Sequence, residues 1–373
     1  MDSIQAKEIK YGQSKYKNIM GITCYMNANL HILQNVPIFV EYITQQLFKT
    51  TVLQKIKSHD NLKEFVIFEL YRLFKVSLEN DDMIITPSTF KELIGKKNDM
   101  WTELQQQDSQ EFFNFLISQL EEEVGVKTKF IPGENIDFTM VDSFDVSIRN
   151  IMAIKSWTSF QSREYSPLKN MFNGMIETNR SCSCCMTNNI VYEPFVTLGL
   201  SIPIKIKQDI LKSFSIYDCL DHMITEDQLD SKNMMNCEMC GLKNQSFNKT
   251  FLWKTPKILV LHLKRFLVNS YGVTTQKLTN DITYPIKDLD LSKYFDIASP
   301  YKNSCKYDLI GINLHQSFGF GKGINAGHYT SMVKNIMNNN WYLYNDSNDV
   351  KQVINKAHLQ QENAYMLFYY RHD

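Results

Sequence analysis

The sequence has no long apolar run, no leader-like beginning and no excess of charge of either sign. No stretch of about 18 apolar residues occurs, and the opening MDSIQAKEIKYGQSK carries charges with no apolar stretch behind them. Lys plus Arg and Asp plus Glu number 40 each among 373 residues, a balance that indicates neither a nucleic-acid-binding nor a membrane-binding surface. We therefore expect a soluble, intracellular protein with no nucleic acid and no membrane as partner.

Cysteines are few, and they are unevenly distributed. Eight cysteines in a chain of this length are too sparse for a disulfide scaffold, and the missing secretory signal favours a reducing compartment. Four of them form two Cys-x-x-Cys pairs, Cys182 with Cys185 and Cys237 with Cys240. In a reducing compartment such pairs are typical of metal or redox chemistry.

The chain also lacks internal repeats, low-complexity tracts and linkers rich in Pro, Gly and Ser. With 43% hydrophobic residues it is long enough for one large domain or two. Apolar residues recur at helical spacing up to about residue 125, whereas short β-branched and aromatic runs follow later. The sequence thus predicts an α+β fold, with strands expected at 258–263, 307–314, 341–344 and 365–370.

Cys24 lies between a segment with turn or cap signals and a segment with helical periodicity. Gly21 and Thr23 before Cys24 indicate a turn or a helix cap, and apolar residues at helical spacing follow until Pro37. Cys24 is therefore expected at or next to a helix N-terminus. There the helix end and a nearby imidazolium can lower the pKa of a thiol to about 3.5 to 7.5. A buried packing residue and a nucleophile are both compatible with this spacing.

His328 is the histidine best placed to partner such a thiol. It opens a strand pattern, and Asn345 and Asp346 come directly after the run WYLY at 341–344. If the two strands pair as a hairpin around 335–340, the polar end of the second strand lies near His328. A carboxamide or carboxylate there can orient the imidazole, as in a Cys-His-Asn/Asp triad, although a lone histidine is also commonly a packing residue.

The two Cys-x-x-Cys pairs are best explained together. Four thiolates can surround a tetrahedral Zn²⁺, and Gly241 directly after the second pair suits the tight turn that this requires. A redox role would not explain two pairs. Because the pairs lie far apart in sequence, zinc would tie distant parts of the chain together as a structural site. Spacing leaves open whether Cys184 replaces Cys182 or Cys185 as a ligand.

Six motifs follow one another in the order found in one known family. They are GITCYMN, QQDSQEFF at 106–113, VYEPFVTLGLSI at 191–202, PKILVLHLKRF at 256–266, YDLIGINLHQS at 307–317, and AGHYTSMVKN with WYLYNDS. This series resembles the ubiquitin-specific proteases, which are papain-like deubiquitinating cysteine proteases. The resemblance extends from about residue 16 to 370.

The resemblance implies a role for each residue of the candidate site. Cys24 matches the nucleophile that attacks the C-terminal glycine carbonyl of ubiquitin, and His328 matches the general base that then protonates the leaving amine. Asn345 matches the residue that orients the imidazole, and Asp346 matches a second acidic position. The implied reaction is hydrolysis of an isopeptide or peptide bond through a thioester, with ubiquitin and ubiquitinated proteins as partners.

The resemblance also implies an architecture. After an N-terminal extension at 1–15, a single papain-like catalytic domain would cover 16–373, with a helical thumb at about 16–125 and a β-rich palm and fingers at about 126–373. The fingers, at about 175–255, would carry the structural zinc. In the family, the second Cys of the first pair precedes the Glu of the EPF motif by the distance between Cys185 and Glu193. The resemblance therefore implies Cys182, Cys185, Cys237 and Cys240 as ligands, with Cys184 as a bystander. A monomer is expected, in the cytoplasm or nucleus, which includes those of a host cell.

Asp108 and Glu111 can be interpreted either as a helix cap or as a binding site. Ahead of an apolar helix they form a capping box, in which Asp108 accepts from backbone N–H groups and Glu111 reaches back. By resemblance, acidic residues of this segment bind arginines in the C-terminal tail of ubiquitin. The glycines of SFGFGKG, which are Gly319, Gly321 and Gly323, match a mobile loop beside the channel for that tail.

One position departs from the family pattern. The family has an asparagine five residues before the nucleophile, whose amide helps to form the oxyanion hole, whereas this chain has Ile19 there and Asn18 one residue further away. A bulge that returns Asn18 to the site would complete the hole. The Cys24 backbone N–H with Asp346 or a water would be an alternative. If neither applies, the chain is a catalytically impaired, ubiquitin-binding scaffold of the same fold.

Overall fold

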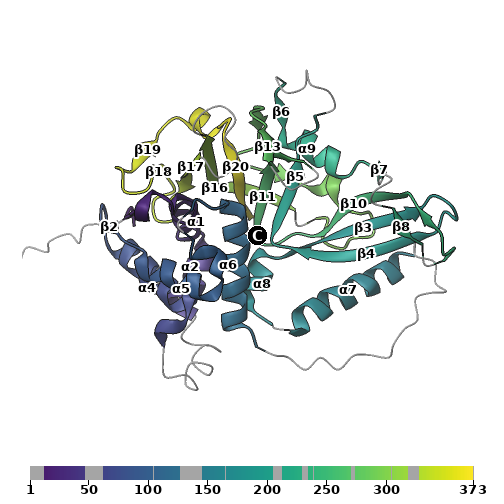
Figure 1. The fold of residues 1–373 in the computed structure, drawn as a ribbon, viewed down its shortest axis with the longest axis horizontal. Helices are drawn as coiled ribbons and strands as arrows, with labels where there is room; N and C mark the ends of the chain where they lie inside the picture. The colour runs from purple at the N-terminus through teal and green to yellow at the C-terminus, as the bar shows by residue number, and fades with distance from the viewer. Residues whose placement is uncertain are drawn as a thin grey trace, which may run out of the picture. The chain divides into compact units, whose positions relative to one another are not determined.

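The fold is shown in Figure 1 as a computed structural model. It describes residues 12–46, 62–103, 105–126, 145–163, 165–204, 212–228, 234–237, 239–269, 274–303, 305–317 and 327–372. The chain divides into two compact units. Unit 1 comprises Met1–Val124, Val268–Lys277 and Ile310–Tyr365, and unit 2 comprises Gly125–Leu267, Leu278–Leu309 and Met366–Asp373. Within the described residues, no helix is both long and apolar enough to span a bilayer.

Unit 1 begins with the predicted helical part of the chain. Strand β1 (Lys15–Tyr16) pairs in parallel with β2 (Ile84–Ile85). The helices of this part are α1 (Cys24–Leu33), α2 (Pro37–Glu41), α4 (Val66–Glu79), α5 (Ser88–Lys97) and α6 (Ser109–Val124). Shorter helical turns are η1 (Ile19–Gly21), η2 (Tyr42–Gln46), η3 (Leu62–Glu64) and η4 (Asp99–Trp101).

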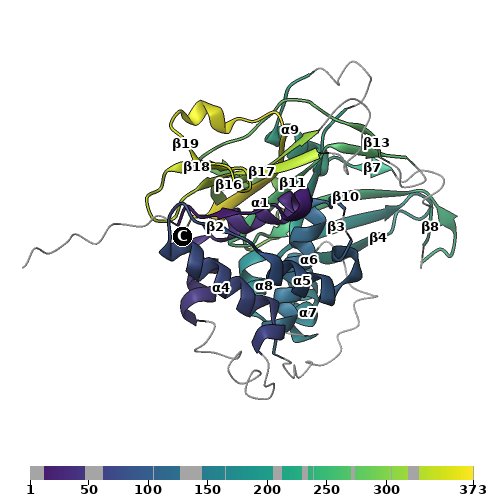
Figure 2. The same cartoon turned by 60° about the vertical axis from the view of Figure 1, so that its left-hand side comes forward.

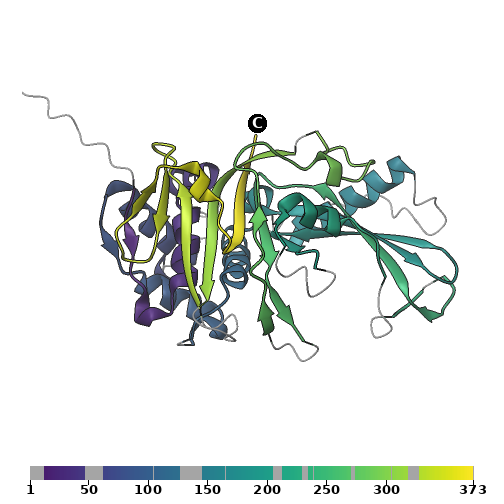
Figure 3. The same ribbon diagram turned by 90° about the horizontal axis from the view of Figure 1, so that it is seen from above.

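The strands of unit 1 form an antiparallel series in the order β19-β18-β17-β16. They are β16 (Lys306–Ser317), β17 (Gly327–Lys334), β18 (Trp341–Tyr344) and β19 (Lys351–Val353), and Figure 3 shows β16 and β17 as neighbouring light-green strands. The hairpin predicted around 335–340 is confirmed, because β17 and β18 pair with Ser331 opposite Tyr344. Strand β13 (Thr274–Lys277) and the turn η7 (Lys356–Leu359) also belong to this unit.

Helix α1 is the core helix of unit 1. All ten of its residues are buried, and it packs against β17 and α6 (Figure 2). A buried polar bridge fixes these contacts: Asn29 Nδ2 donates to the Oγ and the carbonyl oxygen of Ser109, both at 2.9 Å, and Asn313 Nδ2 donates to the same Oγ at 2.7 Å. Buried polar groups are costly when unpaired, so these bonds favour one arrangement of α1, α6 and β16.

Unit 2 contains a four-stranded antiparallel series and a series of mixed parallel and antiparallel strands. The first has the order β4-β3-β10-β7, formed by β3 (Gly174–Cys182), β4 (Asn188–Phe195), β10 (Ser246–Lys254) and β7 (Asp227–Gln228). In the second, β11 (Ile258–Lys264) pairs in parallel with β5 (Thr197–Ser201) and antiparallel with β20 (Ala364–Arg371). Strands β16 and β20 each cross from one unit into the other. All four predicted strands, including 258–263 and 365–370, are thus confirmed.

The remaining elements of unit 2 are short, apart from one long helix. The helices are α7 (Val146–Arg163), α8 (Pro167–Phe172), α9 (Ile216–Met223) and the turn η6 (Ser292–Tyr294). The small strands are β6 (Phe214–Ser215), β8 (Met235–Asn236), β9 (Lys243–Asn244), β12 (Phe266–Val268), β14 (Ile282–Thr283) and β15 (Leu289–Asp290). Together with unit 1 they confirm the predicted α+β class.

A buried ion cluster holds α7 in unit 2. The guanidinium of Arg149, in the first turns of α7, binds Glu177 of β3 and also lies 2.7 Å from Asp296 Oδ2. The hydroxyl of Tyr192 donates to the second oxygen of Glu177 at 2.9 Å. Since an unpaired buried charge is strongly destabilising, this cluster fixes where the helix begins on the sheet.

Candidate active site and metal centre

Cys24 is the first residue of α1, as the sequence predicts, and its side chain is fully buried. Burial raises the pKa of the Cys24 thiol to about 11, and the negative charge of Asp346 acts in the same direction. Backbone hydrogen bonds near Tyr329 and Tyr25 favour the thiolate but do not outweigh the loss of solvation. The predicted position at a helix N-terminus is therefore confirmed, and burial outweighs the lowering of the pKa that a helix end can bring.

His328 is paired with the residue expected to orient it. Its Nε2 lies 2.7 Å from Asn345 Oδ1 and 3.6 Å from Asp346 Oδ2. Because an amide oxygen only accepts hydrogen bonds, the proton in the shorter contact belongs to Nε2. A neutral ring in this tautomer carries its lone pair on Nδ1, which is the atom that a general base uses. The hairpin of β17 and β18 brings these residues together across 17 positions of sequence.

Asp346 is held by amide groups from two other segments. Its Oδ1 accepts from Asn27 Nδ2 at 2.7 Å, and its Oδ2 accepts from Asn18 Nδ2 at 2.9 Å. Burial raises the pKa of Asp346, while these amides and the nearby His328 favour its carboxylate form. The backbone of Asp346 is left-handed, with φ 49°. This uncommon conformation aims the carboxylate at α1 and the turn before it, rather than along the strand.

The segment before Cys24 forms a tight turn around the position that departs from the family pattern. Met20 and Gly21 are both left-handed, with φ 53° and 75°, and the N–H of Ile22 donates to the carbonyl of Ile19 at 3.1 Å. The side-chain oxygen of Asn18 accepts from the N–H of Thr23 at 2.7 Å. Asn18 is one residue further from Cys24 than the family's asparagine, and the turn η1 accommodates this extra residue. The side chain of Asn18 therefore still lies at the start of α1.

Asp108 and Glu111 are in different environments. Asp108 Oδ1 accepts from the N–H groups of Gln110 at 2.7 Å and Glu111 at 3.0 Å, and its Oδ2 accepts from the Tyr365 hydroxyl at 2.5 Å. Asp108 is buried, whereas Glu111 is exposed. Asp108 is therefore the N-terminal cap of α6 with both oxygens engaged, and Glu111 is the carboxylate that faces solvent. The glycines at 319, 321 and 323 lie outside the described residues.

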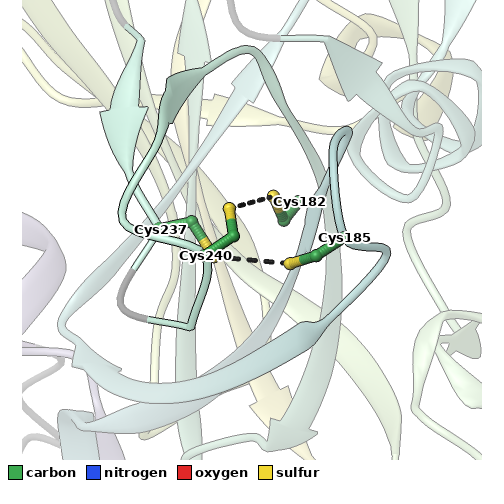
Figure 4. A group of neighbouring side chains, drawn as sticks. All are labelled: Cys182, Cys185, Cys237 and Cys240. Atoms are coloured by element: carbon green, nitrogen blue, oxygen red, sulfur yellow. Dashed lines mark hydrogen bonds between the residues drawn. The ribbon is translucent and has the colours of Figure 1, made fainter.

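The four predicted metal ligands lie together in unit 2 (Figure 4). Cys182 Sγ is 3.9 Å from Cys240 Sγ, Cys185 Sγ is 3.7 Å from Cys237 Sγ, and all four sulfurs lie within 4.8 Å of one another. A tetrahedral zinc site with Zn–S bonds of about 2.3 Å has sulfurs about 3.8 Å apart. The cluster fits that geometry. Cys184 is exposed and is not one of the four.

The two Cys-x-x-Cys turns have the same backbone geometry. In the first, Met186 has φ 59° and donates its N–H to the Cys182 carbonyl at 3.0 Å. In the second, Gly241 has φ 69° and donates its N–H to the Cys237 carbonyl at 2.8 Å. The sequence therefore predicted the turn at Gly241 correctly. Met186 takes the same left-handed conformation without being glycine, which only the structure reveals.

Asn27 and Tyr365 contribute to the candidate site without having been singled out from the sequence. Asn27 binds Asp346, and Tyr365 binds Asp108. For Asn27 a signal existed, because it is a polar residue about one helical turn after Cys24, between the apolar residues Met26 and Ala28. Tyr365 lies inside an apolar strand pattern, where an aromatic residue is expected for packing alone, so the sequence offered no signal for it.

Comparisons with known proteins place this geometry in a family context. The family profile described as "Ubiquitin carboxyl-terminal hydrolase" matches residues 16–369. Ubiquitin carboxyl-terminal hydrolase 2 from Bos taurus is 28% identical over 99% of the chain and 56% of its own length, so the chain spans little more than half of that relative. A probable ubiquitin carboxyl-terminal hydrolase, R319, from Acanthamoeba polyphaga mimivirus is 27% identical over 98% of the chain and 93% of its own length.

A solved structure with the same fold is the SAGA Ubp8/Sgf11/Sus1/Sgf73 DUB module bound to ubiquitin aldehyde. Its matching chain has a TM-score of 0.64 and is 22% identical, over 100% of this chain and 72% of its own length. At this identity the likeness concerns the fold alone. It confirms the predicted papain-like arrangement with a four-cysteine ribbon.

The environment of Cys24 leads to a prediction about its reactivity in the isolated protein. Since the thiolate reacts and burial raises the pKa to about 11, alkylation by iodoacetamide should be slow at pH 7 and rise about tenfold per pH unit up to pH 9.5. Mass spectrometry of the Cys24 peptide measures the rate, with the exposed Cys184 as internal reference. A rate that is already at its plateau at pH 7 would show a preformed thiolate instead.

Proposed function

Because the chain belongs to the ubiquitin carboxyl-terminal hydrolase family, we propose that it is a deubiquitinating cysteine protease. It hydrolyses the isopeptide or peptide bond at the C-terminus of ubiquitin, and ubiquitin and ubiquitinated proteins are its partners. The observation that carries this proposal is the bond between His328 and Asn345 at 2.7 Å, in the same unit as Cys24 at the start of α1. These are the three side chains that thiol-dependent acyl transfer requires.

The proposed reaction follows from the protonation states. His328 Nδ1 takes the proton of the Cys24 thiol as sulfur attacks the carbonyl carbon, and Asn345 keeps the ring in the tautomer that leaves Nδ1 basic. The imidazolium then gives this proton to the departing amine, which leaves a thioester between Cys24 and ubiquitin. A water molecule, deprotonated by the same ring, hydrolyses the thioester and regenerates the thiol.

Two donors can stabilise the oxyanion in this scheme. One is the backbone N–H of Cys24, since the first N–H groups of a helix have no partner within it. The other is the side-chain amide of Asn18, which the turn η1 holds at the start of α1. One hydrogen of that amide is directed at Asp346, and the second remains for the oxyanion. Asp346 thereby positions Asn18, and its carboxylate oxygen Oδ2 lies 3.6 Å from His328 Nε2.

In the proposed resting state the thiol of Cys24 is neutral. Burial raises its pKa to about 11, so it keeps its proton at neutral pH. Bound substrate excludes water and brings the carbonyl to the sulfur, so that proton transfer and attack occur together. The raised pKa of the Cys24 thiol, and Ile19 at the position where the family has asparagine, favour one alternative. This alternative is a ubiquitin-binding scaffold of the same fold with impaired catalysis.

Zinc is proposed for the four-cysteine cluster, with a structural role. The sulfur spacing fits a tetrahedral ion, and both turns present their cysteines in the same way. Zinc would supply the bonds that hold the loop after β3 to the loop between β8 and β9. We assign this region, at about 175–255, as fingers, with the helical thumb at about 16–125, the palm and fingers together at about 126–373, and an extension at 1–15.

Glu111 is the proposed acidic contact for the tail of ubiquitin. Asp108 has both carboxylate oxygens engaged inside the protein, whereas Glu111 projects from the first turn of α6 into solvent. The substrate implies a eukaryotic cell, or a virus or parasite acting within one, and the mimivirus relative is compatible with the second setting. We propose a monomer in the cytoplasm or nucleus.

One prediction of this function concerns catalysis. On ubiquitin with a fluorogenic C-terminal amide, Cys24→Ala should lower kcat/KM by about 10⁴-fold or more, and Asn18→Ala by about 10²-fold through the lost oxyanion donor. Ile19→Ala, its neighbour in the same turn, is the matched control and should change the rate less than about threefold. An inert wild type that still binds ubiquitin would instead identify the scaffold.

A second prediction separates the two carboxylates of α6. Glu111→Ala should raise KM about five- to tenfold with little change in kcat, because a charge that binds ubiquitin equally before and during reaction is lost. Asp108→Ala should lower the free energy of unfolding in urea by about 1 kcal/mol or more, since it removes the cap of α6. The assignment fails if Glu111→Ala leaves KM unchanged.

A third prediction concerns the metal. Elemental analysis should find about one zinc ion per chain in the wild type and in Cys184→Ser, and much less in Cys237→Ser. The last variant should also melt at a temperature lower by about 5 °C or more and bind ubiquitin more weakly, because the two loops are no longer tied together. Equal zinc content in the two variants would contradict the ligand assignment.

A further inference from the structure

We propose that His315 is a positioning residue for His328: its ring supports the backbone at Gly327 and thereby fixes where the imidazole of His328 lies. This rests on the proposed function and deepens it, because His328 is the general base of that reaction. The inference comes from the contact between the ring of His315, in β16, and Gly327, the first residue of β17.

Position 327 has room for glycine alone. A β-carbon there would overlap Nε2 of His315, and it would lie 2.6 Å from Cε1 of the same ring and 2.9 Å from the carbonyl oxygen of Gln316. The backbone of Gly327 is not left-handed, so conformational freedom does not account for the glycine. The close approach of the His315 ring to the backbone is what requires it.

The ring that makes this contact is firmly held. The N–H of His315 donates to the carbonyl of Asn363 at 3.0 Å, and its carbonyl accepts from Nζ of Lys277 at 2.6 Å. The side chain is fully buried, and its ring centroid lies 4.6 Å from that of Tyr329 and 6.1 Å from that of Tyr365. A ring packed in this way is a rigid support for the strand that begins beside it.

The support reaches His328 through the backbone. His315 lies opposite Tyr329 in the pairing of β16 with β17. Because side chains alternate along a strand, His315 shares one face of the sheet with Tyr329 and Gly327, and the side chain of His328 leaves the strand on the other face. The N–H of Gly327 also donates to Oε1 of Gln106 at 3.2 Å. The backbone directly before His328 is thus held at two points.

His315 acts by its position and not by proton transfer. Burial lowers the pKa of its imidazole to about 3, so the ring is neutral at pH 7. The bond between His328 Nε2 and Asn345 Oδ1, at 2.7 Å, tolerates little displacement of the strand. A misplacement of about 1 Å near a reacting group costs about 10²-fold in rate. A side chain at position 327 that pushes the strand away from the ring should therefore slow the chemical step.

The test measures kcat and KM of the full chain on ubiquitin with a fluorogenic C-terminal amide. The variants are Gly327→Ala, His315→Ala and the double variant with both changes. The matched control is Gly311→Ala, in β16 of the same unit and opposite Val333 near the other end of β17. A β-carbon there would also meet a buried side chain, at 2.8 Å from Cγ2 of Ile32. Thermal melting gives the folded fraction of each variant.

Gly327→Ala should lower kcat about 10- to 100-fold and change KM less than about threefold. His315→Ala should lower kcat about fivefold, because the support is lost. The double variant should match His315→Ala within about twofold, since the ring atoms that an alanine at position 327 would meet are gone. Gly311→Ala should melt at a lower temperature, because its core is overpacked, and keep kcat within about twofold.

Three results would each overturn the inference. Losses that multiply in the double variant would show that the two positions act separately. A raised KM with unchanged kcat in Gly327→Ala would place its effect in ubiquitin binding. An equal loss of kcat in Gly311→Ala would show that overpacking anywhere in this sheet is enough, and this comparison decides even if His315→Ala does not fold. A wild type that is inert on the amide removes the proposed function itself, and is recognised without any variant.

Discussion

The carboxylate of Asp346 is the point on which the candidate site depends. It accepts from Asn18 in the turn η1 and from Asn27 in α1, and it lies beside His328 at the start of β17. A largely buried carboxylate is tolerated only when such donors satisfy it. The bonds therefore join segments more than 300 positions apart in sequence. Without these bonds, the positions of the turn, the helix and the hairpin relative to one another would be less firmly fixed.

Unit 2 is organised by a different kind of constraint. The buried ion cluster of Arg149 fixes α7 on the sheet that contains β3. The four cysteines lie together in two loops of the same unit. Metal coordination is suited to this task, because two short loops with exposed ends bury too little apolar surface to hold each other. Unit 1 thus contains the polar site around Asp346, and unit 2 contains two polar clusters, the ion cluster of Arg149 and the four cysteines.

Burial of Cys24 links the fold to the proposed chemistry. The same packing that holds α1 against β17 and α6 removes the thiol from water and disfavours its charged form. A neutral thiol is protected from oxidation and from unspecific alkylation, since the thiolate is the reactive species. In the proposed reaction the substrate completes the site, which suits the proposed substrate, a folded protein with a flexible tail.

Local sequence sufficed for the features that depend on short-range pattern. Hydrophobic periodicity located the strands at 258–263 and 341–344, a cap signal placed Cys24 at a helix start, and the Cys-x-x-Cys spacing identified the ligand candidates. Tertiary structure alone decided how the side chains are paired: that Asn18 and Asn27 share Asp346, and that Tyr365 occupies the second oxygen of Asp108. It also decided that the Cys24 thiol is neutral. The reason is physical, because periodicity reports which face of an element is buried, whereas hydrogen-bond partners and solvation are set by residues that folding brings from distant parts of the chain.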